Sequence, residues 1–256
     1  MSLKLNARAH AVADQMAAQA DELRLVIHVG PKGGRIIDCG IAAVGGLAAG
    51  LMLARVCLAD LANVTLTPGP LVQVFTDAPL AACLGAQYAG WEIKLGKLFA
   101  MGSGPMRAAA GREELLKHFG LLERASAVVG VLETRQLPGP DVLDFVAEAC
   151  GVLPEQVTLL CAPTASLAGT LQIVARSVET ALHKLHLLGF DLTQIRSAHG
   201  LAPVPPVPAS DLTAIGLTND AIRFGGQVVR WTFDAQEQID ALGPRVPASA
   251  AKEGDV

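Results

Sequence analysis

The strongest constraint on the fold is an alternation of short apolar runs with longer helical patterns, separated by glycines and prolines. Runs such as SAVVGVLE (126–133) and VTLLCAPTAS (157–166) have the length and the β-branched content of buried strands. Helical patterns lie between them, as in LPGPDVLDFVAEACG (137–151), which begins at Pro–Gly–Pro and stops at a glycine. This alternation predicts an α/β protein whose strands run in mixed directions.

The same reasoning assigns the other segments. Helices are expected over residues 5–22, 45–62, 79–88, 167–190 and 211–226, with a short one near Pro105. Strands are expected over 24–29, 35–40, 227–234 and, as a pair, within 64–77. The glycines of 90–104 and the prolines of 201–210 predict irregular segments, and the tail after Val246 is expected to fray.

Composition excludes several classes of protein. Hydrophobic residues make up 51% of the 256 residues and charged residues 17%, which favours an ordered core over disorder. The net charge is −4 and there is no basic run, so nucleic acid is not an expected partner. The most apolar stretch, 39–54, is shorter than the ~20 residues that a membrane span needs.

The cysteines and the N-terminus bear on the compartment. The five cysteines form no C-x-x-C pair, which is typical of reduced thiols in a cytosolic protein. The first residues, MSLKLNARAHAVADQ, contain no uninterrupted apolar stretch of the kind that a secretory signal requires. These features predict a cytoplasmic protein without a membrane partner.

The segment 176–186 carries Arg176, Glu179, His183 and His186 at offsets of three or four, and three interpretations stay open. A metal site is one, but no second cluster completes the ligand shell and the spacing differs from the usual zinc helix. A solvated helix face with an Arg176–Glu179 ion pair is another. In the third, a half-buried carboxylate takes a proton from water while the guanidinium stabilises developing negative charge.

Other motifs carry weaker signals. The loop GSGP (102–105) is either a structural turn or a set of backbone N–H groups facing an anion or a polar heterocycle, and it lacks the rest of a dinucleotide fingerprint. The residues TND (218–220) suit helix capping. Ser103 and Ser166 have no evident His–Asp partners, so a serine-hydrolase triad is not supported.

In order along the chain, these motifs resemble one family, methenyltetrahydromethanopterin cyclohydrolase, from about residue 10 to residue 234. The two most specific blocks are FAMGSGP (99–105) and APTASLAGTLQIVARSVETALHKLH (162–186). The other matching segments are IIDCG (36–40), the glycines of 45–50, VQVFTD (72–77), AQYAGWEI (86–93), LE and LP within 132–138, AP (202–203) and TNDAI with FGG (218–226).

The resemblance implies an enzyme that reversibly hydrolyses 5,10-methenyltetrahydromethanopterin to its 5-formyl form. The pterin carrier would be the substrate, with no bound cofactor and no metal. The pathway would be formaldehyde oxidation in a bacterium or methanogenesis in an archaeon. The fold would be a single unit, 1–256, of two intertwined α/β lobes with mixed sheets and a substrate cleft between them, assembled as a homotrimer.

The resemblance also assigns roles to residues. Glu179 would activate the water, and Arg176 would tune and position Glu179. Contacts with the substrate are expected from Lys94, Gly102, Ser103, Gly104, Pro105, Thr164, Ser166, Asn219 and Asp220.

The chain departs from the family's pattern at four positions and at its end. Ala48, Ala78, Leu201 and Phe224 stand where the family commonly has an acidic residue, histidine, threonine and tyrosine. The chain ends soon after VPAS (246–249), where family members usually continue. These departures leave an alternative open, a divergent pterin-binding relative that is non-catalytic or has an altered substrate.

Overall fold

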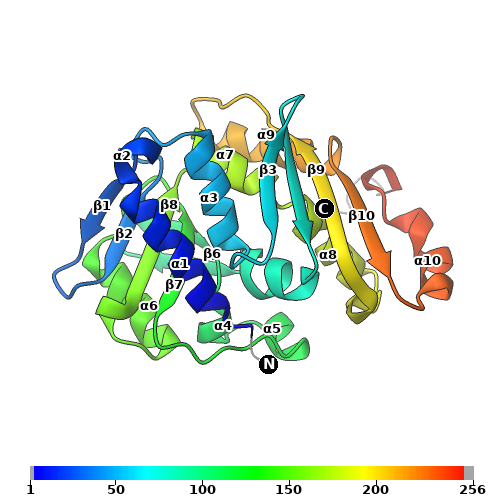
Figure 1. The fold of residues 1–256 in the computed structure, drawn as a ribbon, viewed down its shortest axis with the longest axis horizontal. Coiled ribbons are helices and arrows are strands. Elements are labelled where there is room, and N and C mark those ends of the chain that lie inside the picture. The colour runs from blue at the N-terminus through cyan, green and yellow to red at the C-terminus, as the bar shows by residue number, and fades with distance from the viewer. Residues whose placement is uncertain (1–2, 251–256) are drawn as a thin grey trace.

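Two β-sheets organise the structure, a computed structural model that describes residues 3–250 (Figure 1). The larger sheet has six strands, and its middle strands β2, β8 and β7 are parallel, whereas the strands at both edges are antiparallel. In spatial order the strands are β1 (Val26–Val29), β2 (Arg35–Asp38), β8 (Val157–Ala162), β7 (Val128–Glu133), β6 (Leu98–Ser103) and β5 (Trp91–Leu95).

The smaller sheet is antiparallel throughout and lies beside the first (Figure 1). Its spatial order is β10 (Gln227–Thr232), β9 (Ile195–Pro203), β4 (Leu71–Thr76) and β3 (Asn63–Thr67). With helices packed on both sheets, the class predicted from the sequence, α/β with mixed sheets, is confirmed.

Helices cover the sheets. The α-helices are α1 (Leu5–Ala18), α2 (Ala20–Leu23), α3 (Leu47–Cys57), α4 (Met106–Ala110), α5 (Glu114–His118), α6 (Pro140–Cys150), α7 (Leu167–Val174), α8 (Ser177–Leu187), α9 (Asp211–Arg223) and α10 (Gln236–Leu242). A π-helix, η1 (Leu80–Gln87), and short 3₁₀ turns at Pro154–Gln156, Leu192–Gln194, Gly243–Arg245 and Ala248–Ala250 complete the set. No helix of residues 3–250 is long and apolar enough to cross a membrane.

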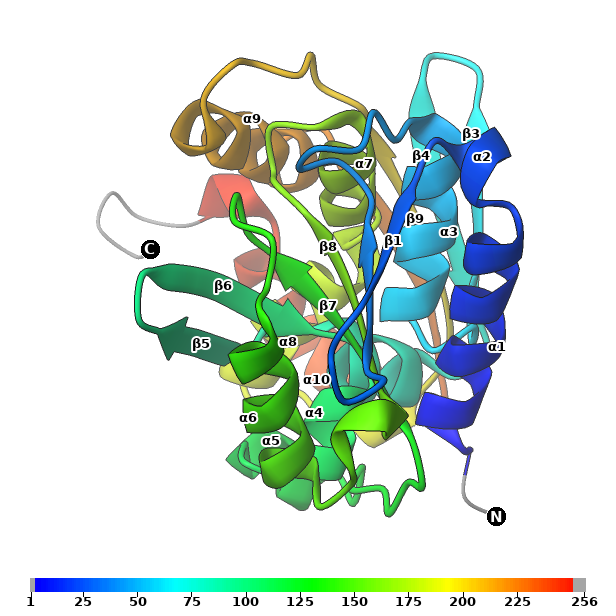
Figure 2. The same cartoon turned by 90° about the vertical axis from the view of Figure 1, so that its left-hand side faces the viewer.

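Helix α3 contributes to a hydrophobic core against each of the two sheets. Its residues Leu53 and Val56 pack with α1 and with one face of the six-stranded sheet, and α6 covers the opposite face (Figure 2). Ala54 of the same helix packs instead with Val72 and Val74 of β4 in the core of the smaller sheet. Because one helix contributes to both cores, no single point of the chain separates two units; the two intertwined lobes and the cleft between them stay a prediction.

Strands occupy all or part of two segments predicted to be irregular. The prediction is wrong for 90–104 and for 201–203, and it is confirmed for 204–210, which has no helix or strand. The segment 90–104 forms the β5–β6 hairpin. In β5, Trp91 and Ile93 are buried, whereas Glu92 and Lys94 are exposed. Gly96, at φ +57°, forms its turn. Residues 201–203 end strand β9, whose Gly200 lies so close to α8 that a Cβ would come within 2.4 Å of the Ser177 hydroxyl oxygen.

The predicted helices are mostly present, with two differences. The helix entered at Pro79 is a π-helix, closed by an i→i+5 bond from the Tyr88 N–H to the Cys83 carbonyl. The helix predicted over 167–190 is two helices, α7 and α8. The tail predicted to fray after Val246 includes the turn at 248–250, and residues 251–256 lie outside the described residues.

Asn6 connects the first helix to the six-stranded sheet. Its fully buried side chain donates to the Pro105 carbonyl at 2.9 Å and accepts from the Val129 N–H at 3.0 Å. It also donates to the Glu123 carboxylate at 2.8 Å.

Replacing Asn6 by Ala leaves the buried Val129 N–H without its partner, whereas the Pro105 carbonyl still accepts from the Ala108 N–H. We expect the free energy of unfolding to fall by about 1–3 kcal/mol, the cost of one such unsatisfied group. Urea unfolding measures the change, and Asn63→Ala, at an exposed position of β3, serves as the control. A loss for Asn6→Ala no greater than that of the control would contradict the role assigned to Asn6.

Candidate active site

The break between α7 and α8 positions the two residues that the sequence selected. Helix α7 ends at Val174, and Arg176 is the residue before the first turn of α8, where Glu179 lies. The Arg176 N–H bonds to the Ile173 carbonyl, three residues back, so the α-helical pattern tightens there. In one continuous helix both side chains would lie on one face. Because the helix breaks at 175–176, the two side chains lie in different surroundings.

Arg176 is buried, with 8% of its surface exposed, and hydrogen bonds fix its guanidinium. Nη1 donates to the Gln87 carbonyl at 2.7 Å, at the end of η1. Nη2 donates to the Ser103 hydroxyl of β6 at 3.2 Å and to the Gln172 amide oxygen of α7 at 3.3 Å. The interpretation of this helix as a solvated face is therefore wrong, and none of the ion pairs within residues 3–250 joins Arg176 to Glu179.

Glu179 is the group best suited to move a proton. Only 6% of its surface is exposed, and this burial raises the pKa of its carboxyl from 4.5 to about 7. The guanidinium groups of Arg176 and Arg107 act in the opposite direction and lower that pKa. A carboxyl that titrates near neutral pH can accept a proton from water and return it, as general acid–base catalysis requires.

A second buried arginine and a stack of rings adjoin Glu179. Arg107 of α4 forms an ion pair with Glu113 and donates to the carbonyls of η1 at Leu84 and Ala86. Its guanidinium lies 5.1 Å from the centre of the Tyr88 ring, which stacks on His183 of α8 at 5.0 Å. Sequence reasoning missed Arg107, Tyr88 and the carbonyl of residue 87; the conspicuous segment AQYAGWEI (86–93) was the available signal.

The end of β6 and the loop after β8 meet next to Arg176. Ser103 accepts from Arg176, and the buried thiol of Cys57 lies 3.7 Å from the Ser103 hydroxyl. Burial raises the pKa of the Cys57 thiol. The Arg176 guanidinium lowers this pKa and the Glu133 carboxylate raises it, so both charges act on Cys57. Glu133 accepts a hydrogen bond from Thr164. Ser103 thus contacts Arg176, and Thr164 contacts Glu133, a neighbour that sequence reasoning did not select. The predicted contact of Ser103 and Thr164 with the substrate stays a prediction.

The backbone of the glycine loop 102–105 makes contacts within the fold rather than facing an anion site. The Gly104 N–H, at φ +86°, donates to the Ala86 carbonyl at 2.8 Å and is not directed at a ligand. A Cβ on Gly102 would come within 2.9 Å of the Trp91 carbonyl oxygen. Pro105 begins α4, which has only five residues. The loop brings the end of β6 against η1, and this contact places Ser103.

The remaining predicted contacts lie in other settings. Ser166 caps α7, accepting from the Gly169 N–H at 3.0 Å. Lys94 of β5 is largely exposed and pairs with Glu92 at 2.7 Å. Asn219 and Asp220 are exposed positions within α9, so the interpretation of 218–220 as a cap is wrong. Their contact with a substrate stays a prediction.

The histidines of α8 pack against rings. His183 stacks on Tyr88, and the ring of His186 lies 5.4 Å from that of Phe119. In the part of the chain that the structure describes, no three His, Cys, Asp or Glu side chains are grouped so that they could hold a metal ion.

A buried carboxyl of raised pKa beside guanidinium groups, in an α/β fold, defines an acid–base site for chemistry on water or a polar substrate. The family model described as "Cyclohydrolase (MCH)" matches residues 4–254, and the chain belongs to that family. The chain is 46% identical to methenyltetrahydromethanopterin cyclohydrolase of Rhodopirellula baltica, over 86% of this chain and 70% of the relative.

Two further relatives bear the same name. The protein of Methylobacillus flagellatus is 43% identical, over 91% of this chain and 74% of its own length. That of Methanosarcina barkeri is 38% identical, over 98% of this chain and 81% of its own length. The alignments with these two relatives thus cover 91% and 98% of this chain.

The raised pKa of Glu179 makes stability depend on pH. A carboxyl whose pKa is 4.5 unfolded and about 7 folded binds its proton more tightly in the folded state. Its favourable contribution is complete below pH 4.5 and is lost as the pH rises through about 7. The change corresponds to about 3 kcal/mol.

We therefore expect the unfolding free energy of the wild type to fall between pH 4.5 and 8 relative to that of Glu179→Gln, by up to about 3 kcal/mol. Urea unfolding of both proteins at each pH measures the difference, and the other titrating groups cancel in the comparison. Parallel pH dependences of the two proteins would show that Glu179 titrates normally.

Proposed function

We propose that this protein hydrolyses the methenyl bridge of 5,10-methenyltetrahydromethanopterin, reversibly forming the 5-formyl compound. The observation that carries the proposal is a carboxyl of pKa about 7, Glu179, buried one helical turn from a guanidinium that is fixed by three hydrogen bonds. The relatives described above bear the name of this enzyme, which supports catalysis over a non-catalytic pterin-binding role.

In the proposed reaction, water attacks the methenyl carbon, which lies between two nitrogens of a cationic amidinium. A C–O bond forms and Glu179 accepts the proton of the water. The hydroxyl group of this adduct then loses its proton as the C=O bond forms. At the same time the bond from this carbon to N10 breaks, its electron pair stays on N10, and N10 takes up one proton in place of the one that the hydroxyl lost. The carbon remains on N5 as the formyl group, and one proton is released overall.

The two residues have complementary tasks. Ionised Glu179 is the base, and its burial makes it basic enough to act near neutral pH. Arg176 keeps part of Glu179 ionised, since its charge lowers the pKa that burial raises, and it positions Glu179, which orients the water. The pterin carrier enters as substrate, and these side chains supply the proton transfer and the charge without a bound cofactor.

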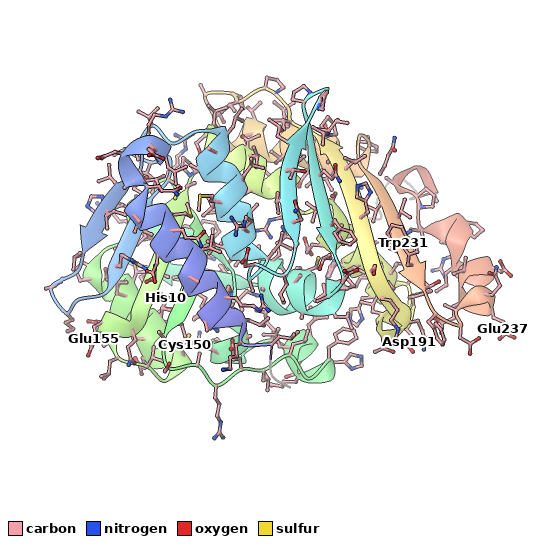
Figure 3. The ribbon with its side chains drawn as sticks, viewed as in Figure 1. His10, Cys150, Glu155, Asp191, Trp231 and Glu237 are labelled. Atoms are coloured by element: carbon pink, nitrogen blue, oxygen red, sulfur yellow. The ribbon has the colours of Figure 1, made fainter. Side chains whose placement is uncertain are left out.

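We also propose a cytoplasmic homotrimer that acts in one-carbon metabolism, in formaldehyde oxidation or methanogenesis. Unpaired cysteines, most of them buried, support a reducing compartment. The outer face of the smaller sheet carries Phe75, Val229 and Trp231, each at least 40% exposed (Trp231 is labelled in Figure 3). Such an apolar face supports contact between copies of the chain.

Replacing Glu179 by Gln tests the base. We expect kcat for loss of the methenyl chromophore to fall about 10²–10⁴-fold with little change in substrate affinity, because an amide cannot accept the proton. Near-ultraviolet absorbance follows turnover, and Glu148→Gln, on α6, is the matched control. An active Glu179→Gln enzyme would refute the assigned role, and an inactive wild type would refute the function itself.

The pH–rate profile tests the charge balance. We expect kcat/KM to rise with pH through an apparent pKa near 7, because only the ionised carboxylate is a base. In Arg176→Gln the guanidinium that lowers this pKa is absent, so the rise should move to higher pH as the rate falls. A midpoint that stays in place would mean that Arg176 does not tune Glu179.

A further inference from the structure

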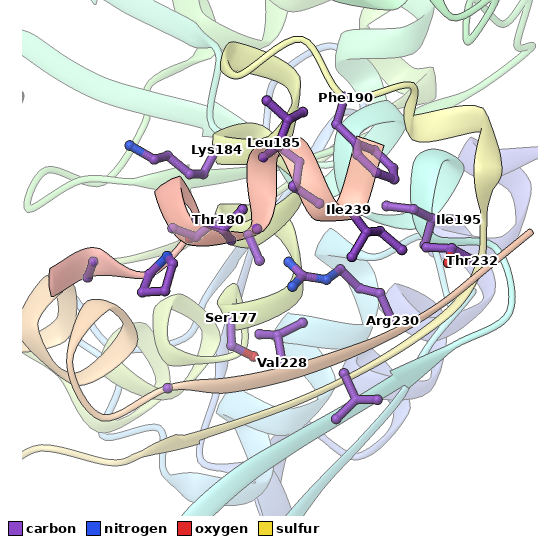
Figure 4. Close-up of a pocket in the computed structure, with 18 of the residues that line it drawn as sticks. Ser177, Thr180, Lys184, Leu185, Phe190, Ile195, Val228, Arg230, Thr232 and Ile239 are labelled. Atoms are coloured by element: carbon purple, nitrogen blue, oxygen red, sulfur yellow. The ribbon is translucent and has the colours of Figure 1, made fainter. Parts of the chain in front are cut away.

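Helix α8 borders a cavity of about 700 Å³ on the face turned away from Glu179. The cavity lies between α8, β10 and α10, and its volume is within the range of about 300–1,000 Å³ common for small-molecule sites (Figure 4). Its α8 residues are Ser177, Thr180, Ala181, Lys184 and Leu185. Successive helix residues are about 100° apart, so these five point in a direction different from that of Glu179 and His183.

The walls of the cavity are mostly apolar. Leu185 and Phe190 contribute from the end of α8 and the loop after it, and Ile239 and Leu242 contribute from α10. Figure 4 shows Ile239 and Leu185 on one side of the cavity and Val228 on the other. An apolar ligand body would therefore be well accommodated.

The ionisable side chains of residues 3–250 that line the cavity are all cationic. They are Lys184, Arg223 and Arg230, and no carboxylate of these residues is in the lining. None of the three takes part in an ion pair within residues 3–250. Arg230 reaches from β10 into the cavity toward α8 (Figure 4), and burial lowers the pKa of its guanidinium with no carboxylate acting against it.

A hydroxyl group in the same cavity also has no partner. Ser177 is 2% exposed, and its Oγ is buried without a hydrogen bond to any described residue. A partly desolvated guanidinium and an unsatisfied hydroxyl are both costly unless a ligand supplies the acceptor. An anion held against β10 removes the cost at the guanidinium, whereas the Ser177 hydroxyl lies against Gly200 of β9.

We propose that this cavity binds an organic anion with an apolar body, such as a long-chain carboxylate or phosphate ester. Arg230 binds the anionic head, and Lys184 adds to its recognition. The apolar body lies against α10 and Phe190. The site is separate from the catalytic pair and does not depend on the proposed reaction.

The experiment uses two fluorescent probes of similar shape and different charge. They are 8-anilinonaphthalene-1-sulfonate, an anion, and N-phenyl-1-naphthylamine, its neutral counterpart. We expect both to bind the wild-type chain saturably, at one molecule per chain. Arg230→Gln should weaken the sulfonate at least about tenfold and leave the neutral probe unchanged, since a hydrogen bond to a charged group contributes about 1.5–3 kcal/mol.

Two more variants make the result decisive. Arg196→Gln, on the neighbouring strand β9 and outside the cavity, should bind the sulfonate as the wild type does. Ala181→Phe fills the cavity and should abolish binding of both probes, while circular dichroism checks that each variant is folded. Sulfonate binding that survives both Arg230→Gln and Ala181→Phe, or no saturable binding to the wild type, would overturn the proposal.

Competition distinguishes the possible ligands. Dodecanoate and dodecyl phosphate should each displace the sulfonate, and the tighter of the two identifies the preferred head group. Inorganic phosphate alone should not displace it, because it lacks the apolar body. Displacement by inorganic phosphate as effective as that by dodecyl phosphate would refute the amphipathic ligand.

Discussion

The site depends on one buried guanidinium. Arg176 is removed from water, and a charge in that position is tolerated only when its donors are satisfied. Its partners come from the end of η1, the end of β6 and the last turn of α7. These elements are distant in sequence, so the position of Arg176 requires the hairpin, the π-helix and the helix break to form together.

The chemistry of Glu179 follows from a balance of two opposing effects. Burial alone would favour the protonated carboxyl, which cannot act as a base. A direct ion pair with Arg176 would favour the ionised form so strongly that it would be a poor base. Nearby guanidinium groups without a direct pair keep the pKa between these extremes. Because Arg107 is already paired with Glu113, its effect on Glu179 is weakened.

The class of fold could be predicted from the sequence because apolar runs and glycine or proline stops mark most elements. The β5–β6 hairpin could not, since its glycines indicate loops until pairing shows that Trp91 and Ile93 share a buried face. The break at Arg176 was also hidden, because ARSVETALHK has no proline or glycine and suits a continuous helix. Tertiary hydrogen bonds to the guanidinium, absent from local pattern, fix that break.

The local sequence pattern singled out candidate residues but did not predict their surroundings in the fold. The sequence singled out Arg176 and Glu179 as a pair, and their catalytic roles stay a prediction. An i,i+3 spacing is equally compatible with an exposed ion pair, and only the packing of η1 against α8 shows that both side chains are buried. That packing occupies one face of α8, with Tyr88 on His183. The opposite face borders the cavity of Arg230. Helix α8 therefore contributes one face to the surroundings of Glu179 and the other to the lining of the cavity.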